Sequence, residues 1–127
     1  MAKKKDSSLL DLQNYISQKK TSPIYLCGEE RFFVEEGLSF IKNTALAPAS
    51  MDFNYDLFYA REDSASKIFD VIETLPMMAE RRLVIVRKAH DLKEADWDLF
   101  APFLTNPSPS TLLVFVGKNL DLSLIHI

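Results

Sequence analysis

The chain has little cysteine or glycine, no long apolar run and no excess of positive charge. Its one cysteine, Cys27, excludes an internal disulfide and a multi-cysteine metal site, and it fits a reducing cytoplasm. No apolar stretch is long enough to cross a membrane, and we expect no secretion signal behind the basic start at Lys3–Lys5. The net charge of −3 argues against a domain that binds nucleic acid through a broad basic surface.

The 127 residues are enough for one domain with a real core. Unbroken apolar runs at Leu83–Val86 and Thr111–Val116 are typical of strands covered on both faces of a parallel sheet. Shorter strands are expected at residues 23–27 and 53–59. Amphipathic helices are expected over residues 7–20, 29–46 and 64–75, and from residue 94, where Pro102 should kink or end the helix. This alternation predicts an α/β fold with three layers, αβα, and a mainly parallel sheet.

Several side chains are placed by the same pattern. Leu75 falls on the apolar face of the helix over residues 64–75, and Cys27 lies inside a strand, so both are expected in the core. Charged pairs at Arg81-Arg82 and Arg87-Lys88 should mark the points where the strand between them leaves the core. His90 is expected in a surface turn.

The first strand and its following turn stand where an αβα nucleotide-binding fold keeps its phosphate loop. Such a loop needs glycines, a lysine on the phosphates and a Ser/Thr on magnesium. This chain has Gly28-Glu29-Glu30-Arg31, with no lysine and two carboxylates that would repel phosphates. An ordinary strand-to-helix turn is therefore favoured over a triphosphate site.

The strand Leu83–Val86 stands where the same fold keeps its second motif, an apolar run ending in Asp-Glu that holds magnesium. Here the run ends in Arg87-Lys88, which cannot hold a metal ion. His90 and His126 are the only histidines, and neither has ligand-type neighbours at metal-binding spacing. The sequence shows no nucleophile–base pair, so we predict no catalytic residue, metal or cofactor.

Met77 and Met78 follow Pro76 and so lie outside the regular helix. Flexible, polarisable methionines suit an adaptable contact surface, but they also fill cores. Taken alone, the residues favour core packing.

Five segments stand in a recognisable order and spacing: 25–30 (YLCGEE), 52–54 (DFN), 73–76 (ETLP), 79–84 (AERRLV) and 109–113 (PSTLL). Through these segments the chain resembles, from Pro23 to Asp121, the delta subunit of the bacterial DNA polymerase III clamp loader. The family is related to AAA+ ATPases, and the resemblance implies a first domain that has lost its nucleotide site. It thus implies that Gly28, Glu29, Glu30 and Arg31 are a degenerate phosphate loop, and Arg87 and Lys88 a degenerate second motif.

The resemblance also implies a partner. The first domain of this family opens the ring-shaped sliding clamp with a hydrophobic pair, and the matching positions here are Met77 and Met78, with Leu75 and Pro76 shaping the turn. This reverses the interpretation of the methionines as core residues. The implied partners are the sliding clamp (the beta subunit), other clamp-loader subunits through C-terminal domains absent here, and DNA through the assembled complex, without a membrane. The implied location is the cytoplasmic replisome.

The end of the chain departs from the family, which continues with a basic, helix-forming stretch. Leu122–Ile127 reads instead like the in-frame translation of a transposase sequencing adapter. We therefore expect residues 1–121 to be an N-terminal AAA+-like clamp-binding domain, incomplete at its C-terminus, and residues 122–127 to be a non-native tail. Two alternatives stay open: an active P-loop NTPase, and an αβα scaffold domain without clamp contact.

Overall fold

The sheet of this protein is parallel throughout its described part. The computed structural model describes residues 23–27, 31–46 and 51–118. Within them, four strands lie in the order β1-β4-β3-β2, and each neighbouring pair is parallel. The strands are β1 (Ile24–Cys27), β2 (Tyr55–Tyr59), β3 (Arg82–Arg87) and β4 (Thr111–Gly117). The helix expected over residues 7–20 and the tail 122–127 fall outside the described ranges.

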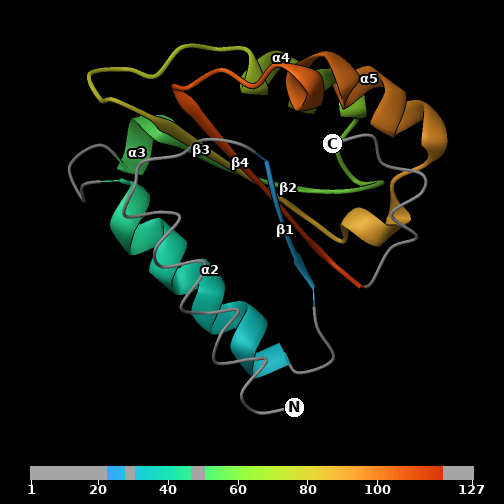
Figure 1. Cartoon of the computed structure of the whole chain (residues 1–127), viewed down its shortest axis with the longest axis horizontal. Helices are drawn as coiled ribbons and strands as arrows, with labels where there is room; N and C mark the ends of the chain where they lie inside the picture. Colours follow the sequence, from blue (N-terminus) through green and yellow to red (C-terminus); the bar gives the residue numbers. More distant parts are fainter. Residues whose placement is uncertain (1–22, 28–30, 47–50, 119–127) are drawn as a thin grey trace.

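Helices cover both faces of the sheet (Figure 1). Helix α2 (Arg31–Ala45) lies on one face, and α4 (Ala65–Ile72) and α5 (Glu94–Thr105) lie on the other. Two short elements, α3 (Met51–Asn54) and η2 (Ala89–Asp91), join helices to strands. The predicted three-layer αβα architecture is therefore confirmed. Among the described helices, none has the length and apolar character that crossing a bilayer requires.

The sheet separates two apolar cores because successive side chains of a strand point to opposite faces. On β3, Leu83 and Ile85 belong to the core under α2, whereas Val84 and Val86 belong to the core under α4 and α5. Strand β4 alternates in the same way. The buried members under α2 are Leu38, Ile41, Leu46, Leu83, Ile85, Leu112, Val114 and Val116. Those on the other face include Ile68, Ile72, Trp97, Phe100, Phe103, Leu113 and Phe115.

Helix α4 ends earlier than the sequence pattern predicts. Its start is confirmed, since the Ser64 hydroxyl accepts a hydrogen bond from the Lys67 N–H, but its last residue is Ile72 and Glu73 caps it. Pro76 disfavours helical backbone at the residue before it. The prediction that Leu75 lies on the buried helix face is therefore wrong, and its side chain is exposed.

Four further expectations are corrected. Phe53 lies in α3, so the second strand begins at Tyr55. Pro102 does not end α5, which continues to Thr105, so only the first of its two expected effects, a kink, stays a prediction. Cys27 is exposed because β1 is an edge strand among the described strands. Arg81 and Arg82 are buried, so the polypeptide enters the core before β3 begins.

Candidate functional site

The carboxyl edge of the sheet is where ligands bind in open α/β folds. Arg87, at the end of β3, pairs with Glu35 of α2 at 2.5 Å, so its charge ties the helix to the sheet. Lys88 is exposed and has left-handed backbone, with φ of 56°. Residues 28–30 of the predicted degenerate phosphate loop are not among those described, nor is the side chain of Arg31. In the described ranges no three His, Cys, Asp or Glu side chains could hold a metal ion.

A polar cavity of about 360 Å³ lies near the carboxyl ends of β2 and β3. Two of the carboxylates that line it already accept backbone hydrogen bonds: Asp63 from the Tyr59 N–H, and Asp96 from the Lys93 N–H. These bonds serve the turns that start α4 and α5. The Ser64 hydroxyl in the same lining likewise accepts the Lys67 N–H at the start of α4.

His90 and Tyr25 close the carboxyl end of β4. His90 Nδ1 accepts the Lys118 N–H at 3.1 Å, and Tyr25 Oη donates to the Lys118 carbonyl at 2.7 Å. Burial, and to a lesser degree Cys27, raises the pKa of Tyr25 to about 12. His90 thus lies half-buried in the short helical turn η2, and its side chain holds the backbone of Lys118.

The amino edge of the sheet carries a different feature, the segment 73–81 that joins α4 to β3, which we call the α4–β3 loop. Met78 is 100% exposed, Leu75 74% and Met77 59%, while Pro76 is half-buried. In Figure 1 this loop extends past the sheet at the upper left, near α3. The core packing that the residues alone favoured for the two methionines is therefore wrong.

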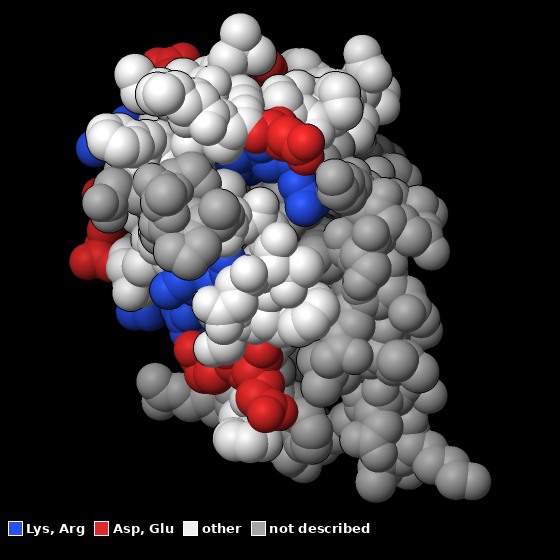
Figure 2. All heavy atoms as spheres, turned by 90° about the vertical axis from the view of Figure 1, so that its left-hand side faces the viewer, with Lys and Arg blue, Asp and Glu red and all other residues white. Residues whose placement is uncertain are grey.

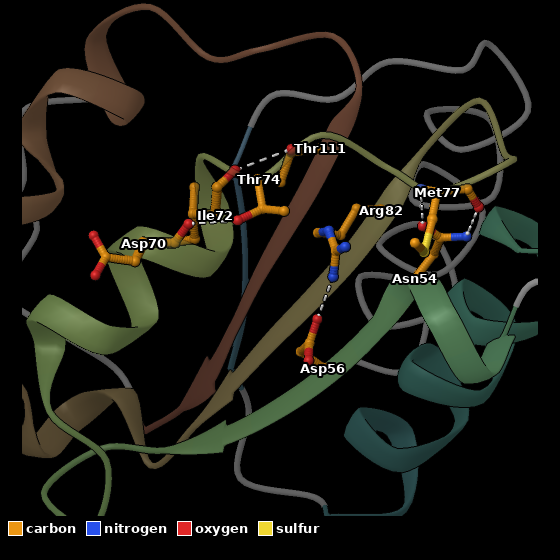
Figure 3. Close-up of polar contacts among 8 residues, drawn as sticks. All are labelled: Asn54, Asp56, Asp70, Ile72, Thr74, Met77, Arg82 and Thr111. Atoms are coloured by element: carbon orange, nitrogen blue, oxygen red, sulfur yellow. Dashed lines mark hydrogen bonds and ion pairs between the residues drawn. The ribbon is translucent and has the colours of Figure 1, made fainter.

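The loop backbone is held at its tip although its side chains are exposed. The Asn54 side chain donates from Nδ2 to the Met77 carbonyl at 2.7 Å, and its Oδ1 accepts the Met77 N–H at 2.5 Å (Figure 3). Asn54 is itself fully buried. Met78, the next residue, has φ of 55°, a left-handed conformation that costs a non-glycine residue roughly 1–2 kcal/mol.

Both ends of the loop are also fixed to the sheet (Figure 3). At the α4 end, the Thr111 hydroxyl donates to the Ile72 carbonyl at 3.1 Å. At the β3 end, the Arg82 N–H bonds to the Ser110 carbonyl at 2.7 Å, and Arg82 Nη1 pairs with Asp56 Oδ2 at 2.6 Å. The structure therefore brings the predicted residues Leu75, Pro76, Met77 and Met78 together on one anchored, apolar loop.

The sequence alone did not indicate that Asn54 holds the α4–β3 loop. Segment 52–54 contributed to the family resemblance, yet it suggested no role for its members. Phe53 is 61% exposed and directly precedes the asparagine that holds the loop. The available signal was an amide residue inside a largely aromatic stretch, a position where a buried polar group needs a partner.

Charge does not dominate this side of the molecule. Figure 2 shows that face of the molecule from which the loop extends, and acidic and basic side chains lie mixed among uncharged ones. On the described surface in that view, no broad basic patch is present. A partner of the loop would therefore be recognised chiefly by apolar contact.

Comparison with known proteins points to one family. Residues 25–124 match the family model described as DNA polymerase III, delta subunit. The DNA polymerase III subunit delta of Bacillus subtilis is 28% identical over 118 residues, which cover 86% of this chain and 34% of that protein. A Helicobacter pylori protein is also 28% identical, over 108 residues that cover 82% of this chain and 32% of the relative. The chain thus spans about a third of the length of these relatives.

Two solved structures share the fold. The Bacillus subtilis DNA clamp loader delta protein (YqeN) superimposes with a TM-score of 0.78 at 26% identity, over 89% of this chain and 37% of that one. A DNA polymerase III gamma subunit-related protein from Thermotoga maritima gives a TM-score of 0.67 at 19% identity, over 87% and 39% respectively. The second likeness shows the fold alone. Both support the predicted AAA+-like αβα fold.

Proposed function

The chain belongs to the family of DNA polymerase III delta subunits, and on this premise we propose that its α4–β3 loop binds the DNA sliding clamp and helps to open the clamp ring. The observation that carries the proposal is the exposure of Leu75, Met77 and Met78 on a loop with an anchored backbone. Exposed apolar side chains on a rigid support are what an interface anchor requires. Methionine adds flexibility that lets the side chain fit an apolar pocket.

Clamp opening would follow from differential binding. A ligand shifts a conformational equilibrium only as far as it binds one state better than the other. The loop would insert into an apolar pocket on the clamp and bind the open ring more tightly than the closed one. This step needs no nucleotide at the carboxyl edge of this domain, where Arg87 pairs with Glu35.

The remaining contacts of the loader are part of the same proposal. Residues 1–121 would be the N-terminal AAA+-like domain of a longer delta subunit. Contacts with other loader subunits, and with DNA in the assembled complex, would come largely from the rest of that subunit. The complex would act in the cytoplasmic replisome as a non-catalytic part of the polymerase holoenzyme.

A charge substitution tests the proposal. Met78→Asp should abolish binding to the cognate sliding clamp in surface plasmon resonance, since a carboxylate buried in an apolar pocket loses its hydration. It should also abolish clamp release from circular DNA. The matched control is Leu99→Asp, at an apolar residue of α5 that is also exposed. Equal affinities for wild type and Met78→Asp, or equal losses in both variants, would refute the assignment of the loop.

A further inference from the structure

We infer that Asn54 is a positioning residue of the clamp contact, an inference that rests on the proposed function. Its side chain sets the backbone of the Met77–Met78 turn before any partner arrives. Asn54 ends α3 and precedes β2, and it lies 23 residues from Met77 in sequence. The turn is thus governed by a residue outside its own loop.

The two hydrogen bonds require the amide group. Asn54 donates to the Met77 carbonyl at 2.7 Å and accepts the Met77 N–H at 2.5 Å, so it satisfies both backbone groups of one residue. At neutral pH a primary amide of this length presents a donor and an acceptor side by side, whereas an ionised carboxylate only accepts and an alkyl group does neither. Full burial of Asn54 strengthens the requirement, since an unpaired polar group there would be costly.

The two hydrogen bonds to Met77 also constrain the backbone of Met78. With φ of 55°, Met78 occupies a region that persists only where the surroundings impose it. The residue before it is fixed at both backbone groups, and this fixes the direction in which the fully exposed Met78 side chain leaves the loop. A turn that is already ordered loses less conformational freedom on binding, which increases affinity without any new contact.

The support of Asn54 is itself rigid. Two residues further on, Asp56 pairs with Arg82 at the start of β3. Strands β2 and β3 then pair from Tyr55↔Leu83 to Tyr59↔Arg87. Asn54 therefore directly precedes β2, and β2 is paired with β3, the strand into which the loop runs.

The test compares Asn54→Asp with wild type in the full-length protein at pH 8. The substituted carboxylate can still accept the Met77 N–H, but it cannot donate to the Met77 carbonyl. Because two oxygens that carry negative charge then face each other, the turn should open more often and expose the Met77 amide to water. Without clamp, hydrogen exchange of the Met77 amide should accelerate at least tenfold. With clamp, affinity should fall at least tenfold, and this loss should vanish in a background that carries Met77→Ala and Met78→Ala. At pH 5.5 the affinity of Asn54→Asp should recover toward wild type, because a protonated carboxyl group can again donate.

The matched control is Tyr25→Phe, which removes one side-chain hydrogen bond to the backbone at the opposite edge of the sheet. It should change neither Met77 exchange nor clamp affinity. If Asn54→Asp is unfolded at pH 8, Asn54→Ser is measured in its place. Unchanged exchange at Met77, or an affinity loss that persists in the double-alanine background, would overturn the inference. If Asn54→Asp accelerates exchange at Met77 but the wild-type protein itself does not bind the clamp, the proposed function is overturned instead.

Discussion

Replacing Met77 and Met78 with alanine should separate binding from folding. Met78 is 100% exposed, so its full burial in a partner is worth about 1.5–3 kcal/mol. Met77 is 59% exposed, so burying its remaining surface is worth about 1–2 kcal/mol by proportion. Ordering the two side chains offsets about 0.5–1.5 kcal/mol for each. The net loss of binding free energy should be about 1.5–2 kcal/mol, which corresponds to a dissociation constant roughly 10- to 30-fold higher.

The assay is a titration of the cognate sliding clamp by isothermal calorimetry, together with a denaturant melt of each variant. The double variant should unfold within about 0.5 kcal/mol of wild type, since both side chains are on the surface. The control is Phe100→Ala, at a side chain that is fully buried under α4 and α5. That change should cost about 3–5 kcal/mol of unfolding free energy. If the double variant loses its cooperative melt while affinity per folded molecule is unchanged, the methionines serve the fold and the site assignment fails.

Three other expectations concern the carboxyl edge of the sheet. Calorimetry should detect no magnesium-dependent ATP binding, because Glu29-Glu30 stands in place of the lysine-bearing phosphate loop and Arg87 is paired with Glu35; micromolar binding would contradict this. The pKa of Tyr25 is raised from 10.0 to about 12, so the folded state keeps this proton longer than the unfolded state. The stability that this raised pKa contributes should be present below pH 10 and be lost as pH rises from 10 toward 12. Denaturant melts of Tyr25→Phe should lack this decline in unfolding free energy, and the same pH dependence in both proteins would contradict the prediction. Gly117→Ala should lower unfolding free energy by about 1–3 kcal/mol in a denaturant melt, because its Cβ would lie 2.7 Å from Tyr25 Oη and 2.9 Å from both His90 N and Nδ1; an unchanged melt would contradict that geometry.

The fold was predictable from sequence where a strand is buried on both faces of the sheet. Strands β3 and β4 are apolar on both faces, so Leu83–Val86 and Thr111–Val116 identify them without a partner. The apolar face of α5, with Trp97, Phe100 and Leu104, was likewise correct. Local periodicity suffices in these cases because the residues pack against the centre of the sheet.

Prediction failed where a contact distant in sequence decides the structure. Leu75 continues the helical spacing of α4, yet the helix ends before it and the loop turns toward Asn54. The aromatic content of residues 53–59 suggested one strand, but Asn54 belongs to a helical turn and bonds to Met77. Cys27 was expected in the core, although a strand at the described edge of a sheet can expose its last residue. The exposed methionines were assigned to a contact surface only through the family resemblance, since the residues taken alone favoured a core.

The arrangement at Lys118 has a mechanical consequence. Hydrogen bonds that are loaded one after another break one at a time, whereas two bonds to the same residue share the load. Tyr25 of β1 and His90 of η2 grip the two backbone groups of Lys118, where the chain leaves β4. A pull on the chain at Lys118 would thus be shared between β1 and η2 before it reached the hydrogen bonds of β4. A pull at Lys118 would therefore act on the sheet as a whole, and it would carry the α4–β3 loop at the amino edge of the sheet along with it.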